Sequence, residues 1–218
     1  MSVTIVGRRL VLKGLSVLAS VGAVALITPG AASATPVKKD GQIPSSRSAN
    51  GWPIEPEANT KGTVWRREII GSGTFVDIKL GPVEVVMMHA LRRYHYEVAP
   101  IRSDEVIGFR HAVHADAGYE TNHASGTAVD VRPDFYPKGT QGGYSKNQME
   151  TIRSILDDCE GVIEWGGDWN DPDEAHFQIA VQPGSAELHR VSEKIQGWKD
   201  APSKGAGTPP WAQNQTRN

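Results

Sequence analysis

Cysteine is almost absent from this chain of 218 residues, which has one, at position 159. A single cysteine excludes an intramolecular disulfide and a four-cysteine zinc site. Its surroundings, IRSILDDCEGVIEW, favour a small residue of the hydrophobic core over a catalytic thiol. The chain also lacks a GxxxxGK[ST] phosphate-binding loop, so the string DEAH at residues 173–176 carries no weight as a helicase motif.

Long hydrophobic runs are missing as well. The mostly apolar stretch at residues 14–27 has 14 residues, fewer than the roughly 20 that a helix needs to cross a bilayer. It follows Arg8 and Arg9 and precedes small residues that end at Ala34, an order typical of a cleaved export signal. The arginine pair favours the twin-arginine route over a plain secretory signal, which also begins with basic residues. We expect cleavage after Ala34 and no stable membrane insertion of the mature protein.

Neither sign of charge dominates, since 23 basic and 25 acidic residues give a formal net charge of -2. Removal of residues 1–34 takes away three basic residues and no acidic one, which moves the net charge to -5. A mildly acidic mature protein argues against nucleic acid as its main partner.

Composition also divides the chain into parts. Residues 35–49 and 200–218 are rich in Pro, Ser and Gly and show no periodic apolar pattern, so we predict a flexible spacer and a disordered tail there. Residues 50–199 are long enough for one compact domain with a core of its own.

Apolar periodicity within residues 50–199 predicts helices and strands in irregular order. Helices are predicted at 82–98, at 145–159 with Ser145 as N-cap, and at 186–199. Strands are predicted at 74–80, 105–110, 126–133, 161–165 and 176–181. Because no strand–helix unit of even length repeats, we predict an α+β fold with a small, mainly antiparallel sheet flanked by helices.

Most of the seven histidines have an ordinary explanation. His89 and His95 lie on the first predicted helix, where packing or surface exposure is commoner than metal binding. His111 and His114 lie in a polar loop and could line a cleft, but a loop histidine is usually only solvated.

His123 differs because of its neighbours in the string HASGTAVD. Gly126 allows a sharp bend, and the small residues around it leave room for the imidazole of His123 and the carboxylate of Asp130 to converge. A zinc site needs a third ligand, and a catalytic one also keeps an open position for water.

A second string, EWGGDWNDPDEAHFQI, supplies the third candidate. His176 begins a strand-like run, and Asp173 lies three residues before it. We therefore predict that His123, Asp130 and His176 bind Zn²⁺ and that Asp173 transfers protons to and from the reacting groups. The alternative is structural: Asp130 caps a turn, and His176 packs beside one of the nearby tryptophans.

The two strings together resemble the zinc D-alanyl-D-alanine carboxypeptidase and L-alanyl-D-glutamate endopeptidase family of peptidoglycan enzymes, whose core is shared with hedgehog signalling domains. The resemblance covers about residues 83–181. It implies a hedgehog-like zinc fold, the same three ligands, and Asp173 as the catalytic acid and base. The GFR at residues 108–110 is similar to the family's Gly-Tyr-Arg strand end, which implies that Arg110 binds substrate and stabilises the oxyanion.

The chain departs from the family pattern at two points. The interval between GFR and His123 is short, which trims a loop that usually contributes to the substrate pocket. Asp173 stands where many relatives have glutamate, and Glu174 is an alternative base, although neighbouring residues in a strand point to opposite sides.

The resemblance implies an exported zinc peptidase, secreted or associated with the cell wall, that hydrolyses the stem peptides of peptidoglycan. The string WGGDW favours cleavage between L-Ala and D-Glu, with removal of terminal D-Ala as the alternative. A non-catalytic, zinc-stabilised module that binds the cell wall is the rival from another class, but a base beside an open metal position argues against it. We expect a monomer.

Overall fold

The structure is a computed structural model that describes residues 46–112 and 118–200. The predicted export signal, most of the predicted spacer, His114 and the predicted tail beyond Asp200 lie outside the described residues. No described helix combines the length and the apolar character that crossing a membrane requires.

Three α-helices form where the apolar periodicity predicts them. They are α1 (Pro82–Arg93), which continues as the π-helix η1 (Tyr94–Val98), α2 (Lys146–Asp158) and α3 (Ala186–Asp200). Helix α1 starts with proline, whose missing N–H has no partner in a first helical turn anyway. The predicted N-cap of α2 is confirmed: the Ser145 side chain accepts a hydrogen bond from the Gln148 amide, and the Gln148 side chain returns one.

A two-stranded hairpin precedes α1. It pairs β1 (Val64–Ile69) with β2 (Thr74–Lys79) in antiparallel orientation. Strand β2 confirms the prediction for this segment, whereas β1 was not predicted. Its sequence, VWRREI, carries charged residues in the middle, and only the two terminal residues of the strand are buried.

The central sheet is antiparallel, with strands in the order β3-β4-β6-β5. Its strands are β3 (Val106–Ile107), β4 (Ala128–Val131), β5 (Ile163–Trp165) and β6 (His176–Ile179). Strand β3 is shorter than predicted because the chain turns at Gly108 toward the hairpin, where the Phe109 amide donates to the Asp77 carbonyl at 2.8 Å. The small antiparallel sheet confirms the predicted α+β class.

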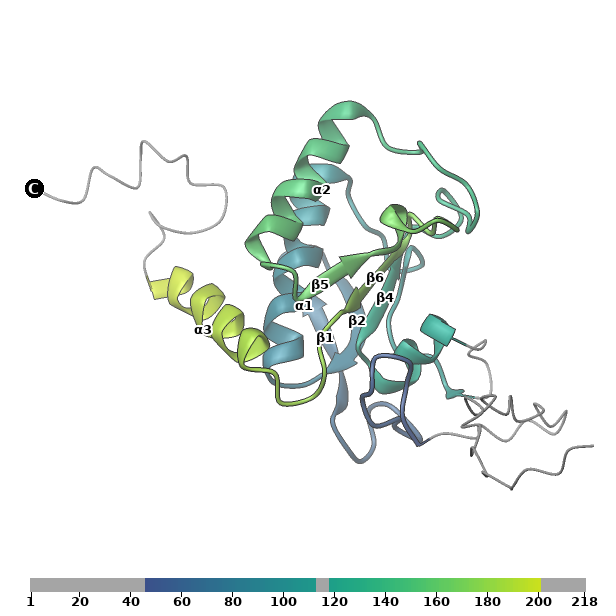
Figure 1. Cartoon of the computed structure of the whole chain (residues 1–218). Coiled ribbons are helices and arrows are strands. Elements are labelled where there is room, and N and C mark those ends of the chain that lie inside the picture. The colour runs from purple at the N-terminus through teal and green to yellow at the C-terminus, as the bar shows by residue number, and fades with distance from the viewer. Residues whose placement is uncertain (1–45, 113–117, 201–218) are drawn as a thin grey trace, which may run out of the picture. The chain divides into compact units, whose positions relative to one another are not determined.

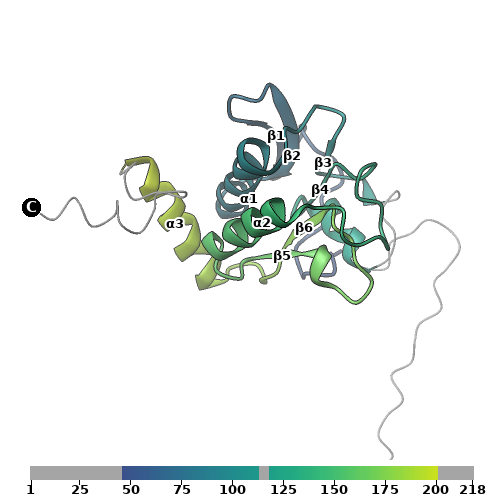
Figure 2. The same ribbon diagram turned by 90° about the horizontal axis from the view of Figure 1, so that it is seen from above.

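The two faces of this sheet differ in chemistry because side chains alternate along each strand. Val129, Val131 and Phe177 are buried in the core together with side chains of α1 and α2. Figures 1 and 2 show these two helices side by side, next to the sheet. The opposite face carries polar side chains, including Asp130 and His176, which are direct partners in the strand register.

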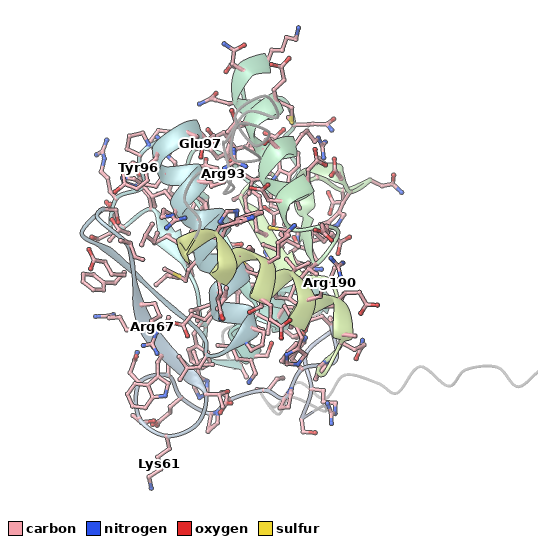
Figure 3. The ribbon with its side chains drawn as sticks, turned by 90° about the vertical axis from the view of Figure 1, so that its left-hand side faces the viewer. Lys61, Arg67, Arg93, Tyr96, Glu97 and Arg190 are labelled. Carbon is pink, nitrogen blue, oxygen red and sulfur yellow. The ribbon has the colours of Figure 1, made fainter. Side chains whose placement is uncertain are left out.

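A buried polar cluster joins α1 to α2. His89 Nε2 donates to Asp158 Oδ2 at 3.0 Å, Arg93 donates to the same oxygen at 2.8 Å, and Arg93 also pairs with Glu97 (Figure 3). Burial raises the pKa of Asp158, but the hydrogen bond from His89 and the charge of Arg93 lower it more, so the pKa lies below its ordinary value. Burial raises the pKa of the adjacent Cys159 thiol to about 12, as expected for an inert core residue.

Candidate metal centre

Three of the predicted site residues meet on the polar face of the sheet. Asp130 of β4 lies directly opposite His176 of β6, and His123 comes from the 3-10 helix η3 (Gly118–Ser125). All three are buried, and one ligand atom from each lies within 4.8 Å of the other two. Asp130 Oδ1 is 3.2 Å from His123 Nε2 and 2.8 Å from His176 Nδ1. The arrangement could hold a metal ion.

The bend predicted at Gly126 brings His123 to Asp130. Gly126 has φ 68°, a left-handed conformation that favours glycine. Its carbonyl accepts a hydrogen bond from the Lys79 amide at 2.9 Å. An added Cβ would come within 2.6 Å of Val64 and 2.9 Å of the Lys79 nitrogen, so no larger residue fits here. The glycine therefore serves both the bend and the close packing against the hairpin.

The tautomer of His123 follows from its other nitrogen. Nδ1 lies 2.7 Å from the carbonyl oxygen of Gly108. A carbonyl can only accept a hydrogen bond, so Nδ1 carries the proton. In the neutral ring, Nε2 then presents its lone pair to Asp130.

The tautomer of His176 is set by a longer chain of contacts. Its Nε2 lies 3.1 Å from Gln178 Oε1, and the Gln178 amide nitrogen donates to Glu164 Oε2 at 2.9 Å. Because a carboxylate only accepts, the contact with Glu164 requires the amide nitrogen on its own side and the amide oxygen toward His176. Nε2 of His176 must therefore donate, and Nδ1 presents its lone pair to Asp130.

This donor set fits a divalent cation. Asp130 is buried, and the guanidinium of Arg110 beside it favours the ionised carboxylate. An anionic oxygen and two imidazole lone pairs thus converge in a buried space, where they repel one another unless a cation lies between them. Two neutral imidazoles and one carboxylate are a ligand set that zinc accepts.

Arg110 contacts the other oxygen of the Asp130 carboxylate. Its guanidinium donates to Asp130 Oδ2 at 3.0 Å and to Glu120 Oε2 at 2.8 Å. The structure therefore places Arg110 beside the ligand group, where it orients the carboxylate of Asp130. Its role toward substrate stays a prediction.

The side chain of Tyr119 connects Asp173 to the candidate ligand His176. The Asp173 carboxylate is buried and accepts a hydrogen bond from the Tyr119 hydroxyl at 2.8 Å. The Tyr119 ring packs against Trp169 and His176, with centroid distances of 4.5 and 4.8 Å. Burial and the hydrogen bond to Asp173 raise the pKa of Tyr119, which keeps its hydroxyl protonated as a donor. The role of Asp173 as acid and base stays a prediction.

The alternative base, Glu174, faces elsewhere. Its two carboxylate oxygens accept hydrogen bonds from the amides of Gly142 and Gly143, at 2.8 and 2.9 Å. The side chain is buried and ties a loop to the chain beside Asp173. Both oxygens are already used, so Glu174 is poorly placed to receive a proton from a reacting water.

Two other histidines lie away from the candidate site, and two residues beside it were not predicted. His89 is buried in the polar cluster between α1 and α2, and His95 accepts a hydrogen bond from the Ile101 amide, so neither lies with the candidate ligands.

The sequence analysis did not predict a role for Gln178, although the two-residue period of a strand places it on the same face as His176. It also missed Tyr119, for which no local pattern gives a signal.

Comparison with known proteins gives one match. The family model described as D-alanyl-D-alanine carboxypeptidase matches residues 115–179. This stretch contains His123, Asp130, Asp173 and His176, whereas Arg110 precedes it. No curated protein and no solved structure matches the chain.

Proposed function

We propose that this chain, whose residues 115–179 match the family model described as D-alanyl-D-alanine carboxypeptidase, is an exported zinc enzyme that hydrolyses peptidoglycan stem peptides. The family acts on peptidoglycan peptides and depends on a metal. The observation that carries the proposal is the buried group of His123, Asp130 and His176, in which three ligand atoms converge and outer hydrogen bonds hold both imidazoles in the metal-binding tautomer.

Metal binding, proton transfer and charge stabilisation are assigned to different residues of the site. His123, Asp130 and His176 would hold zinc, which when bound polarises the scissile carbonyl and makes water more acidic. Asp173 accepts the proton of the attacking water and returns it to the leaving amine. The guanidinium of Arg110 keeps Asp130 in place and adds positive charge near the developing oxyanion.

Two bonds of the stem peptide are candidates. The matched family model points to removal of the terminal D-Ala, and the string WGGDW favours cleavage between L-Ala and D-Glu. Both reactions use the same metal ligands and the same proton transfer. Which of the two bonds is cleaved therefore depends on how the protein holds the rest of the substrate.

We also propose that the protein works outside the cell membrane, secreted or associated with the cell wall. The proposal rests on the basic start with Arg8 and Arg9, the short apolar run and the small residues before Ala34. Peptidoglycan is found in the same compartment.

The test is mass spectrometry of purified muropeptides after incubation with the zinc-loaded mature protein. We expect a loss of terminal D-Ala or a cut after L-Ala, and a chelator should abolish either product while added zinc restores it. A matched His176→Ala protein should be inactive and free of metal. Binding to the cell wall without any cleavage would contradict the enzyme proposal and favour the non-catalytic wall-binding module.

A further inference from the structure

Lys138 lies beside the candidate site without belonging to it. Its ammonium group is 4.5 Å from the centroid of the Tyr119 ring. The same ring contacts His176, and its hydroxyl donates to Asp173. One aromatic side chain thus connects the lysine to a candidate metal ligand and to the candidate acid and base.

The loop that carries Lys138 is tied to the segment that carries Asp173. The amide of Gly139 donates to the carbonyl of Pro172 at 2.7 Å. On the other side of Asp173, the carboxylate of Glu174 accepts from two amides of the same loop. Because both neighbours of Asp173 bind this loop, these hydrogen bonds fix the loop backbone that carries Lys138 relative to Asp173.

The charges around the site leave Lys138 available. Arg110 is engaged by Asp130 and Glu120. Lys138 is exposed and pairs with no carboxylate in the described ranges 46–112 and 118–200. An anionic substrate that approaches the carboxylates of Glu120, Asp130 and Asp173 binds better beside a cation that is not already paired with one of them. Lys138 is such a cation.

Both candidate bonds give the leaving residue a free carboxylate. A terminal D-Ala has one by definition, and D-Glu has two carboxyl groups, of which the continuing chain uses at most one. We propose that Lys138 is a specificity-determining residue: its ammonium group, held over the Tyr119 ring, pairs with the carboxylate of the residue on the leaving side of the scissile bond. This inference rests on the proposed function for the identity of the substrate.

The test compares each peptide acid with its amide. The substrates are diacetyl-L-lysyl-D-alanyl-D-alanine, acetyl-L-alanyl-D-glutamate and their fully amidated forms. For the acid that the parent cleaves, Lys138→Met should raise KM about tenfold, change kcat little, and leave the KM of the amide unchanged. Lys138→Arg should keep most of the preference for the acid. Lys61→Met removes an exposed lysine from the loop before β1 (Figure 3) and should change neither constant.

A binding measurement separates this inference from the proposed function. Calorimetric titration of the zinc-loaded Asp173→Asn protein with each acid and amide reports affinity without turnover. A preference for the acid that disappears in the Asp173→Asn, Lys138→Met protein supports the carboxylate site, even if the parent cleaves neither peptide and the proposed function fails. If the parent cleaves a peptide but Lys138→Met keeps the full preference for the acid, the inference is wrong and the enzyme proposal stands.

Discussion

Replacement of Asp173 by asparagine separates proton transfer from structure. Asparagine has nearly the same shape, and its side-chain oxygen can still accept the hydrogen bond that the Tyr119 hydroxyl donates at 2.8 Å. The ligands and the fold should therefore persist, but an amide cannot take a proton from water at neutral pH. General acid and base catalysis contributes about 10²- to 10⁴-fold, so kcat should fall by that factor, which is about 3–5 kcal/mol of barrier. The assay is kcat on the muropeptide cleaved by the parent, with zinc content measured on the same sample.

The matched control makes the same chemical change one residue later. Glu174→Gln also turns a buried carboxylate into an amide, but this carboxylate binds the amides of Gly142 and Gly143. The side-chain NH2 of the glutamine would face one of these two amide donors, so this variant should lose some stability. It should nevertheless keep kcat within about threefold, because no proton transfer depends on Glu174. If Asp173→Asn with full zinc kept the parent rate while Glu174→Gln lost it, the assignment of the base would be refuted.

The remaining predictions concern the metal and the stability of the fold. Gly126→Ala should lower the free energy of unfolding by more than about 2 kcal/mol in urea titrations, because it adds a steric clash to the left-handed backbone strain. Gly142→Ala, also at positive φ but with open space around it, should cost only about 1 kcal/mol. Equal costs would contradict the packing argument. Gln178→Leu should weaken zinc binding about 10- to 100-fold in competition with a chromophoric chelator, because His176 loses the acceptor that sets its tautomer; unchanged affinity would show that the strand alone positions the ring. Asp158 has a lowered pKa in the folded protein, so its stabilising contribution is present above the unfolded value of about 3.9 and is lost as the pH falls through the lower folded value. Asp158→Asn should therefore cost about 1.5–3 kcal/mol at pH 7 and less at pH 3, and an equal cost at both pH values would count against the buried cluster.

Much of the candidate site was predictable because the candidate ligands come in short strings with local geometry. His123 and Asp130 are separated by a single bend, and Gly126 marks that bend in the sequence. The third candidate ligand, His176, required two strings to be combined, and the register of β4 with β6 places it directly opposite Asp130. Strand β1 escaped prediction because its solvent-facing charges hide the pattern.

The partners of the ligands were harder to predict because they come from distant segments. Glu164 reaches His176 only through Gln178, across two neighbouring strands. Tyr119 reaches Asp173 over 54 residues of chain. Such contacts depend on how the loops pack, and no periodicity in the sequence records them.

The sequence by itself determined the class of fold, the helices and the residue types that can bind a metal, since apolar periodicity, caps and bends are local properties of a chain. Only the tertiary structure decided which nitrogen of each histidine faces Asp130, and that Asp173 rather than Glu174 lies against Tyr119. Those choices depend on the hydrogen bonds that His123 and His176 donate to Gly108 and Gln178, and on those that two loop amides donate to Glu174. These partners meet only after the sheet and its loops have formed.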